Sequence, residues 1–198
     1  HNAYHLMFNE VGIAVYSTLY DSFTGQATLH ICEQLVAYFG LKERPETLVS
    51  MKRAFFKELF YSDPELDLIP GVRERIEEYH ANGLTLVLAS SASMGNINNV
   101  FDRFGLNRFF KAKFSGADLK ASKPHPEIFL KAAEASGYKK EECMVIEDST
   151  NGIAAAHRAG IYCVAFKSPN SKNQDYSKAN KVINDFGEIA YPKIKTLH

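Results

Sequence analysis

Apolar side chains recur every three or four residues through the first third of the chain, which is the spacing of one helix face. Three such faces stand out: Tyr4, Met7, Phe8 and Val11; Cys32, Leu35, Val36 and Phe39; and Leu48, Met51, Phe55 and Leu59. Gly40 directly follows the second face, as is typical where a helix ends. The pattern therefore predicts a small bundle of helices up to about Asp67.

A run of turn-forming residues follows this helical region. Asp63-Pro64 opens it and Ile69-Pro70-Gly71 closes it, and proline and glycine at such positions favour turns over helix or strand. We therefore expect residues 63–71 to form a hinge between two parts of the chain.

Beyond the hinge, short apolar runs alternate with helical patterns. The expected strands are 84–89, 110–115, 143–146 and 161–166, and the expected helices are 72–81, 97–104, 126–136 and 152–159. Strands that are apolar on both faces and joined by helices are typical of a parallel sheet. The predicted fold class is α/β, with a Rossmann-like parallel-sheet core and a small helical bundle. The polar stretch 168–175 is expected to be a loop.

Composition narrows the partners only slightly. Of the 198 residues, 45% are hydrophobic and 23% charged, which is enough to bury a core. Lys plus Arg and Asp plus Glu both number 23, so net charge gives no reason to expect nucleic acid or a membrane surface as a partner. No apolar run is long enough to cross a membrane, and no signal-peptide pattern opens the chain.

The cysteines indicate a reducing compartment. Cys32, Cys143 and Cys163 show no metal-ligand spacing, and we expect them to be free thiols. A soluble cytoplasmic protein is the expectation, and we expect it to be a monomer or a weak homo-oligomer.

A serine-rich turn follows the first expected strand. Ser90 comes directly after Ala89 and is followed by Ser91, Ala92 and Ser93. Small residues ahead of a helix let backbone N–H groups approach an anion, and a serine hydroxyl can donate to a phosphate oxygen. Ser90 and Ser91 are therefore candidate phosphate ligands, although such a turn is also typical of a helix N-cap.

A lysine lies in a loop that is stiffened by proline. Lys123 is followed by Pro124, and Pro126 comes two residues later; proline fixes the backbone there and cannot extend a strand. A fixed ammonium beside a phosphoryl group neutralises developing charge and keeps a nearby carboxylate ionised. Lys123 is thus a candidate catalytic residue, although a loop lysine is also commonly just solvated.

Two adjacent carboxylates end the apolar strand 143–146. Glu147 and Asp148 would repel each other unless a cation lies near them or they remain hydrated. Magnesium favours one or two carboxylates completed by water and phosphate oxygens, so this pair is a candidate Mg²⁺ site. The alternative is that Asp148 or Ser149 caps the helix beginning near Gly152 while Glu147 is solvated.

Three segments together resemble the haloacid dehalogenase superfamily of phosphohydrolases, and specifically its β-phosphoglucomutase-like group. They are LVLASSAS with Ser90, ASKPHPEIF with Lys123, and VIEDSTNGIAAAHRAGI with Glu147 and Asp148. The resemblance covers nearly the whole chain.

This resemblance implies a helical cap domain at 1–67 and a Rossmann-like core at 68–198. It implies that Ser90 and Lys123 are catalytic, that Glu147 and Asp148 bind Mg²⁺, and that the segment FTGQAT at 23–28 reaches into the active site. Gly25, Gln26 and Thr28 would form this substrate loop.

Two features depart from the family pattern. The motif D-x-D-G-[TV], which supplies the family's aspartate nucleophile and acid/base, has no counterpart in these 198 residues and by alignment belongs just before His1. Without it, the sheet is expected to lack its central strand and to expose apolar strand edges. The loop also reads Gly25-Gln26-Ala27-Thr28, whereas mutase members resemble G-x-S followed by a basic residue.

The resemblance implies Mg²⁺-dependent hydrolysis of a small phosphomonoester, such as a sugar phosphate, through an aspartyl-phosphate. One alternative is a β-phosphoglucomutase-like phosphotransferase, which the missing loop cation disfavours. Another is a non-catalytic or truncated domain that binds a phosphorylated ligand without turnover. A dehalogenase is disfavoured because those family members lack the Glu-Asp pair.

Overall fold

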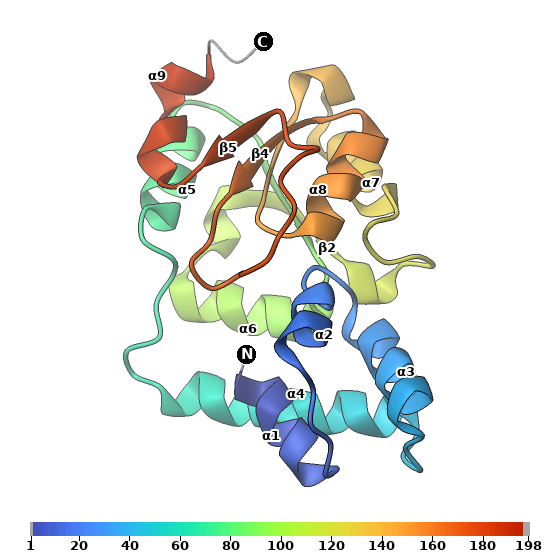
Figure 1. Ribbon diagram of the computed structural model, residues 1–198. Helices are drawn as coiled ribbons and strands as arrows, with labels where there is room; N and C mark the ends of the chain where they lie inside the picture. The colour runs from blue at the N-terminus through green and yellow to red at the C-terminus, as the bar shows by residue number, and fades with distance from the viewer. Residues whose placement is uncertain (1, 196–198) are drawn as a thin grey trace.

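The computed structural model describes residues 2–195, and the N-terminal part of these is helical (Figure 1). The helices are α1 (Asn2–Glu10), α2 (Ser17–Ser22), α3 (Thr28–Phe39) and α4 (Pro45–Ser62). Three of the four carry the predicted apolar faces, which are thereby confirmed as helices. The sequence pattern misses α2 because six residues are too few to show a helical period.

Side chains from α1, α3 and α4, with Phe23 just after α2, share one hydrophobic cluster. Its buried members are Met7, Phe8, Phe23, Ile31, Cys32, Leu35, Leu48 and Val49. Gly40 ends α3 in the left-handed region at φ 63°, and Pro45 is the first residue of α4, where its missing N–H costs nothing. We call residues 2–62 the helical bundle; the predicted domain boundary at 67 stays a prediction.

After residue 71, strands and helices alternate. The strands are β1 (Leu86–Ser90), β2 (Phe110–Ser115), β3 (Met144–Glu147), β4 (Tyr162–Phe166) and β5 (Lys181–Ile183). The helices are α5 (Val72–Ala81), α6 (Met94–Phe104), α7 (Glu127–Ser136), α8 (Thr150–Ala159) and α9 (Tyr191–Ile194), with short 3₁₀ turns at Asn107–Phe109, Gly116–Asp118, Lys140–Glu142 and Phe186–Ile189. Every paired strand is parallel, which confirms the α/β class.

Hydrogen bonds divide the five strands into two sheets, β1-β2 and β3-β4-β5. In the part of the chain that the structure describes, β1 pairs with β2 alone and β3 with β4 alone, so each keeps one unpaired edge. Ile146 on β3 is 38% exposed, and no residue of β1 is fully buried. Helix α7 packs against β1 and β2 and also against α8, which itself packs against β3 and β4. The two helices thus connect the two sheets.

Strand β4 shows why the expected strands are apolar throughout. Cys163 and Ala165 belong to the hydrophobic cluster made with α7 and α8. Val164 and Phe166 belong instead to the cluster that contains Tyr79 of α5. Because successive side chains point to opposite faces of a sheet, a strand covered on both faces must be apolar at every position.

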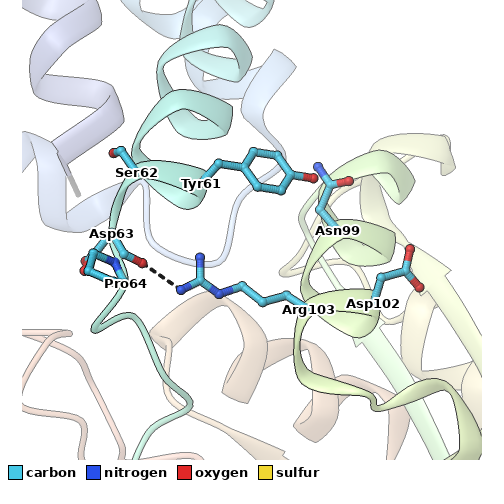
Figure 2. Close-up of a pocket in the computed structure, with 7 residues that line it drawn as sticks. All are labelled: Tyr61, Ser62, Asp63, Pro64, Asn99, Asp102 and Arg103. Atoms are coloured by element: carbon cyan, nitrogen blue, oxygen red, sulfur yellow. Dashed lines mark hydrogen bonds between the residues drawn. The ribbon is translucent and has the colours of Figure 1, made fainter.

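The predicted hinge, residues 63–71, contains neither helix nor strand, and Arg103 of α6 holds it in place. The Arg103 guanidinium donates to the carbonyl oxygens of Phe60, Asp63 and Leu66, at 2.7 Å for Asp63 and 3.2 Å for Leu66. It also lies 4.9 Å from the ring centroid of Phe60. Figure 2 shows Arg103 reaching from α6 to this segment.

Replacing Arg103 with methionine is expected to loosen the hinge. Hydrogen bonds with one charged partner contribute about 1.5–3 kcal/mol, so the free energy of unfolding should fall by about that amount. Urea denaturation measures this, and amide exchange should rise at residues 60–66. Arg108→Met is the control because it removes the same charge from a guanidinium that lies over the Phe109 ring rather than against residues 60–66. An equal fall in the free energy of unfolding in both variants would contradict a specific role for Arg103.

In residues 2–195, no helix is long and apolar enough to cross a membrane.

Candidate active site

The ammonium of Lys123 lies between the two sheets. Its Nζ donates to the carbonyl of Ala89 on β1 at 3.2 Å and to Oε1 of Glu147 on β3 at 2.6 Å, and it lies 4.6 Å from the ring centroid of Phe129. Lys123 is only 6% exposed, so it is not solvated, as a lysine in a loop commonly is. The carboxyl ends of the two strands thus meet around one buried cation.

The second carboxylate oxygen of Glu147 is also engaged. Oε2 accepts hydrogen bonds from the backbone N–H groups of Asp148 at 2.8 Å and Ser149 at 2.9 Å, and from the Ser149 hydroxyl at 3.0 Å. Burial alone raises the pKa of Glu147, but the charge and hydrogen bond of Lys123, with the two N–H groups, outweigh it and hold that pKa below its usual value. Glu147 is therefore an ionised partner of Lys123 rather than a solvated residue.

The Glu147 carboxylate has room only because residue 152 is glycine. A Cβ built at Gly152 would lie 2.0 Å from the Glu147 carboxyl carbon. Ser149 caps α8 by accepting a hydrogen bond from Gly152 N–H at 3.0 Å. One of the N-cap assignments considered from the sequence is thus confirmed for Ser149.

Asp148 is held from a different direction. The Ser171 hydroxyl donates to its Oδ2 at 2.6 Å. Burial, together with the charge of Glu147, raises the pKa of Asp148, and the Ser171 hydrogen bond offsets only part of this. A carboxylate whose charged form is disfavoured in this way gains from a nearby cation.

The donor set is compatible with magnesium, though not as a complete protein cage. Among residues 2–195, no three His, Cys, Asp or Glu side chains converge to hold a metal ion. Asp148 could supply one oxygen ligand with Glu147 adjacent, and Mg²⁺ usually completes such a site with water and phosphate oxygens. Glu147 already accepts from Lys123, Asp148 and Ser149, so Asp148 is the better candidate ligand of the two.

Ser90 and Ser91 lie at the carboxyl end of β1, as expected. Ser90 Oγ accepts from Ala92 N–H at 3.2 Å. Ser91 Oγ donates to the carbonyl of Gly25 in the helical bundle at 2.6 Å. Ser93 occupies the N-cap position of α6 without a side-chain capping bond. Their roles as phosphate ligands stay predictions.

The predicted substrate loop, 23–28, is docked on the same region. Gly25 has φ 81°, and a Cβ there would lie 2.3 Å from Ser149 Oγ, so only glycine allows this approach. Asn151 Nδ2 donates to the carbonyls of Thr24 at 2.8 Å and Ser22 at 3.3 Å. The loop therefore lies directly over the turn that shapes the Glu147 environment.

The other two residues of the predicted loop belong to the bundle side. Gln26 donates to the carbonyl of Ser22 at 2.8 Å and accepts from Gln34 at 2.9 Å. Thr28 is the first residue of α3. Of the three predicted loop residues, Gly25 is the one in contact with the core.

A separate cavity of about 510 Å³ lies beside the hinge (Figure 2). It is lined by Tyr61, Ser62, Asp63, Pro64, Asn99, Asp102 and Arg103. None of the predicted site residues is among these, and we assign this cavity no chemistry.

Sequence reasoning missed three polar residues that complete the site. Asn151 donates to carbonyl groups of the bundle, and Ser171 donates to Asp148. Asn173 donates to Asp21 of the bundle. For Ser171 and Asn173 the available signal was the density of polar side chains in 168–175, which equally fits a solvated loop.

Comparison with known proteins identifies the family. The profile of the haloacid dehalogenase-like hydrolases matches residues 6–166. A haloacid dehalogenase-like hydrolase domain-containing protein of Arabidopsis thaliana is 32% identical over 159 residues, covering 77% of this chain and 49% of that protein. Hexitol phosphatase B of Escherichia coli is 34% identical over 106 residues, covering 54% of this chain and 48% of that protein. The chain thus spans about half the length of these relatives.

Solved structures show the same fold. β-Phosphoglucomutase from Clostridium difficile superposes with a TM-score of 0.85 at 22% identity, covering 98% of this chain and 87% of that chain. CbbY from Rhodobacter sphaeroides in complex with phosphate superposes with a TM-score of 0.80 at 21% identity, covering 94% and 87%. With its parallel α/β core and the profile match over most of its length, the chain belongs to the haloacid dehalogenase-like hydrolase family.

Proposed function

We propose that this chain forms the phosphate-binding and metal-binding part of a Mg²⁺-dependent phosphohydrolase. Its proposed substrate is a small phosphomonoester such as a sugar phosphate. The observation that carries the proposal is the buried Lys123 ammonium, fixed by Ala89 and Glu147 where β1 and β3 end. A preorganised cation at the carboxyl edge of parallel strands is well suited to a phosphoryl group.

Each of these side chains would have a role that follows from its charge. Lys123 would face the phosphoryl oxygens, and Glu147 would hold Lys123 in place. Ser90 would donate a hydrogen bond to the same oxygens. Ser91 would do so only when its hydroxyl leaves the Gly25 carbonyl, to which it now donates its single proton. Asp148, with Glu147 beside it, would hold Mg²⁺, which when bound neutralises part of the phosphoryl charge.

The helical bundle would act as a cap that keeps water from the reacting group. The hydrogen bonds that Gly25 and Thr24 of the bundle accept from Ser91 and Asn151 of the core support this role.

An aspartyl-phosphate intermediate needs an aspartate nucleophile from an Asp-x-Asp segment, and these 198 residues contain no such motif.

Hydrolysis is favoured over phosphate transfer between sugar positions. The loop from Phe23 to Thr28 carries no basic residue, and Gln26 is hydrogen-bonded within the bundle. A cation to hold a second phosphate therefore has no source in this loop. Binding of a phosphorylated ligand without turnover is the competing outcome in the assay below.

In a protein that also carries an Asp-x-Asp segment, Asp148→Asn is expected to abolish Mg²⁺-dependent turnover. Removing a residue that only hydrogen-bonds to a metal ligand lowers activity about 10- to 100-fold, so removing a ligand itself should lower it at least about 100-fold. The assay is phosphate release from a panel of sugar phosphates, with and without a chelator. Asp118→Asn is the control because it removes the same charge at an exposed position.

Unchanged turnover in Asp148→Asn would contradict the metal assignment. Binding of inorganic phosphate by the parent protein without release from any phosphomonoester would favour the binding-domain alternative.

A further inference from the structure

The loop 168–175, which follows β4, touches three separate elements. From the sequence it is an unremarkable polar stretch. In the structure, its side chains contact Asp148 after β3, the first turn of α8, and Asp21 of the helical bundle. A solvated loop would not be expected to make contacts of this kind in three directions.

Toward the core, the loop is hydrogen-bonded to Asp148 and to Thr150, two residues later. Ser171 donates to Asp148 Oδ2 at 2.6 Å. Gln174 Oε1 accepts from Thr150 N–H at 2.8 Å, and Asp175 N–H donates to Thr150 Oγ1 at 2.8 Å. Because Thr150 begins α8, the loop and the Asp148 turn are held as one unit.

Toward the bundle, the contact is made by Asn173. Its Nδ2 donates to Asp21 Oδ2 at 2.6 Å, and Gln174 Nε2 lies 3.5 Å from the carbonyl of Asp21. In residues 2–195, Asn173 is the single non-glycine residue with positive φ, at 56°. Asparagine tolerates this left-handed conformation better than most side chains, and here the conformation accompanies the contact with Asp21.

We propose that loop 168–175 couples the position of the helical bundle to the Asp148 carboxylate. Ser171 is the positioning residue for Asp148, and Asn173, two residues later, is the contact with Asp21. Movement of Asp21 away from the core would pull on the same short backbone segment that presents the Ser171 hydroxyl. The inference rests on the proposed function, in which Asp148 holds Mg²⁺ and the bundle is the cap.

The first test needs neither metal nor substrate. Asn173→Gly removes the amide while keeping a residue that accepts positive φ. Hydrogen–deuterium exchange should then rise about 2- to 10-fold at residues 20–26 and at 148–152, as expected from losing one net hydrogen bond. Lys172→Gly, at the adjacent exposed position, is the matched control and should leave both segments unchanged. Faster exchange confined to 168–175 would overturn the coupling.

The second test reads the positioning of Asp148. Ser171→Ala should weaken Mg²⁺ binding about 10- to 100-fold by calorimetry, the range for losing a hydrogen bond that orients a metal ligand, with KM for the phosphomonoester little changed. Ser171→Thr, which keeps the hydroxyl, should restore most of the affinity. Equal Mg²⁺ affinity in Ser171→Ala and the parent would overturn the positioning role. If the parent neither binds Mg²⁺ nor turns over, the proposed function fails, while the exchange experiment still decides the coupling.

Discussion

Replacing Lys123 with methionine is expected to lower the free energy of unfolding by about 3–5 kcal/mol, the cost of breaking a buried ion pair by removing one partner. The substitution leaves the Glu147 carboxylate buried without its cation. The backbone N–H groups of Asp148 and Ser149 still donate to that carboxylate, so the loss should be smaller than the full cost of burying an isolated charge. Phosphate binding should disappear as well, because among residues 2–195 Lys123 is the only buried lysine or arginine side chain.

A second substitution separates stability from function. Lys123→Met combined with Glu147→Gln removes both charges, while the Gln oxygen can still accept from the two N–H groups. The double variant should recover a large part of the lost stability but none of the phosphate binding. Urea denaturation and phosphate titration measure the two effects. A single Lys123→Met variant with the denaturation midpoint of the parent would contradict the buried pair.

Gly152→Ala is expected to have a comparable effect through sterics alone. A new Cβ would lie 2.0 Å from the carboxyl carbon and from Oε1 of Glu147, so the carboxylate must leave its position. Overpacking usually costs about 1–3 kcal/mol, and here the displaced group would also lose its contact with Lys123. Both stability and turnover should fall.

Gly95→Ala provides the matched control for this steric effect. Gly95 lies in α6, and a Cβ there meets no atom within 4 Å. Alanine is favoured over glycine in helices by about 0.5–1 kcal/mol, so this variant should be neutral or slightly more stable. Thermal unfolding of the two variants distinguishes the outcomes, and similar behaviour of both would contradict the close packing at Gly152.

The sequence predicted the helical bundle and the parallel core because both depend on local periodicity. The α3 face ending at Gly40 and the wholly apolar run of β4 are patterns that burial imposes directly. The division of the strands into two sheets depends instead on which strands pair. Apolar runs such as β1 and β3 do not specify their neighbours.

The candidate site was predictable in its charged residues and not in its geometry. Lys123 and Glu147 were assigned to phosphate and to metal respectively, yet the structure places them in one ion pair. Their separation by 24 positions carries no signal of that contact. The same holds for Ser171, whose bond to Asp148 depends on the path of a loop after β4.

The bundle docks on the core largely through its main chain. Ser91 and Asn151 bind the carbonyl oxygens of Gly25, Thr24 and Ser22 rather than their side chains. Carbonyl groups are present whatever residue occupies a position, so side chains at 22 and 24 can change during evolution without loss of these bonds. Gly25 differs from these neighbours, because a Cβ there would lie 2.3 Å from Ser149 Oγ and the position is therefore restricted to glycine.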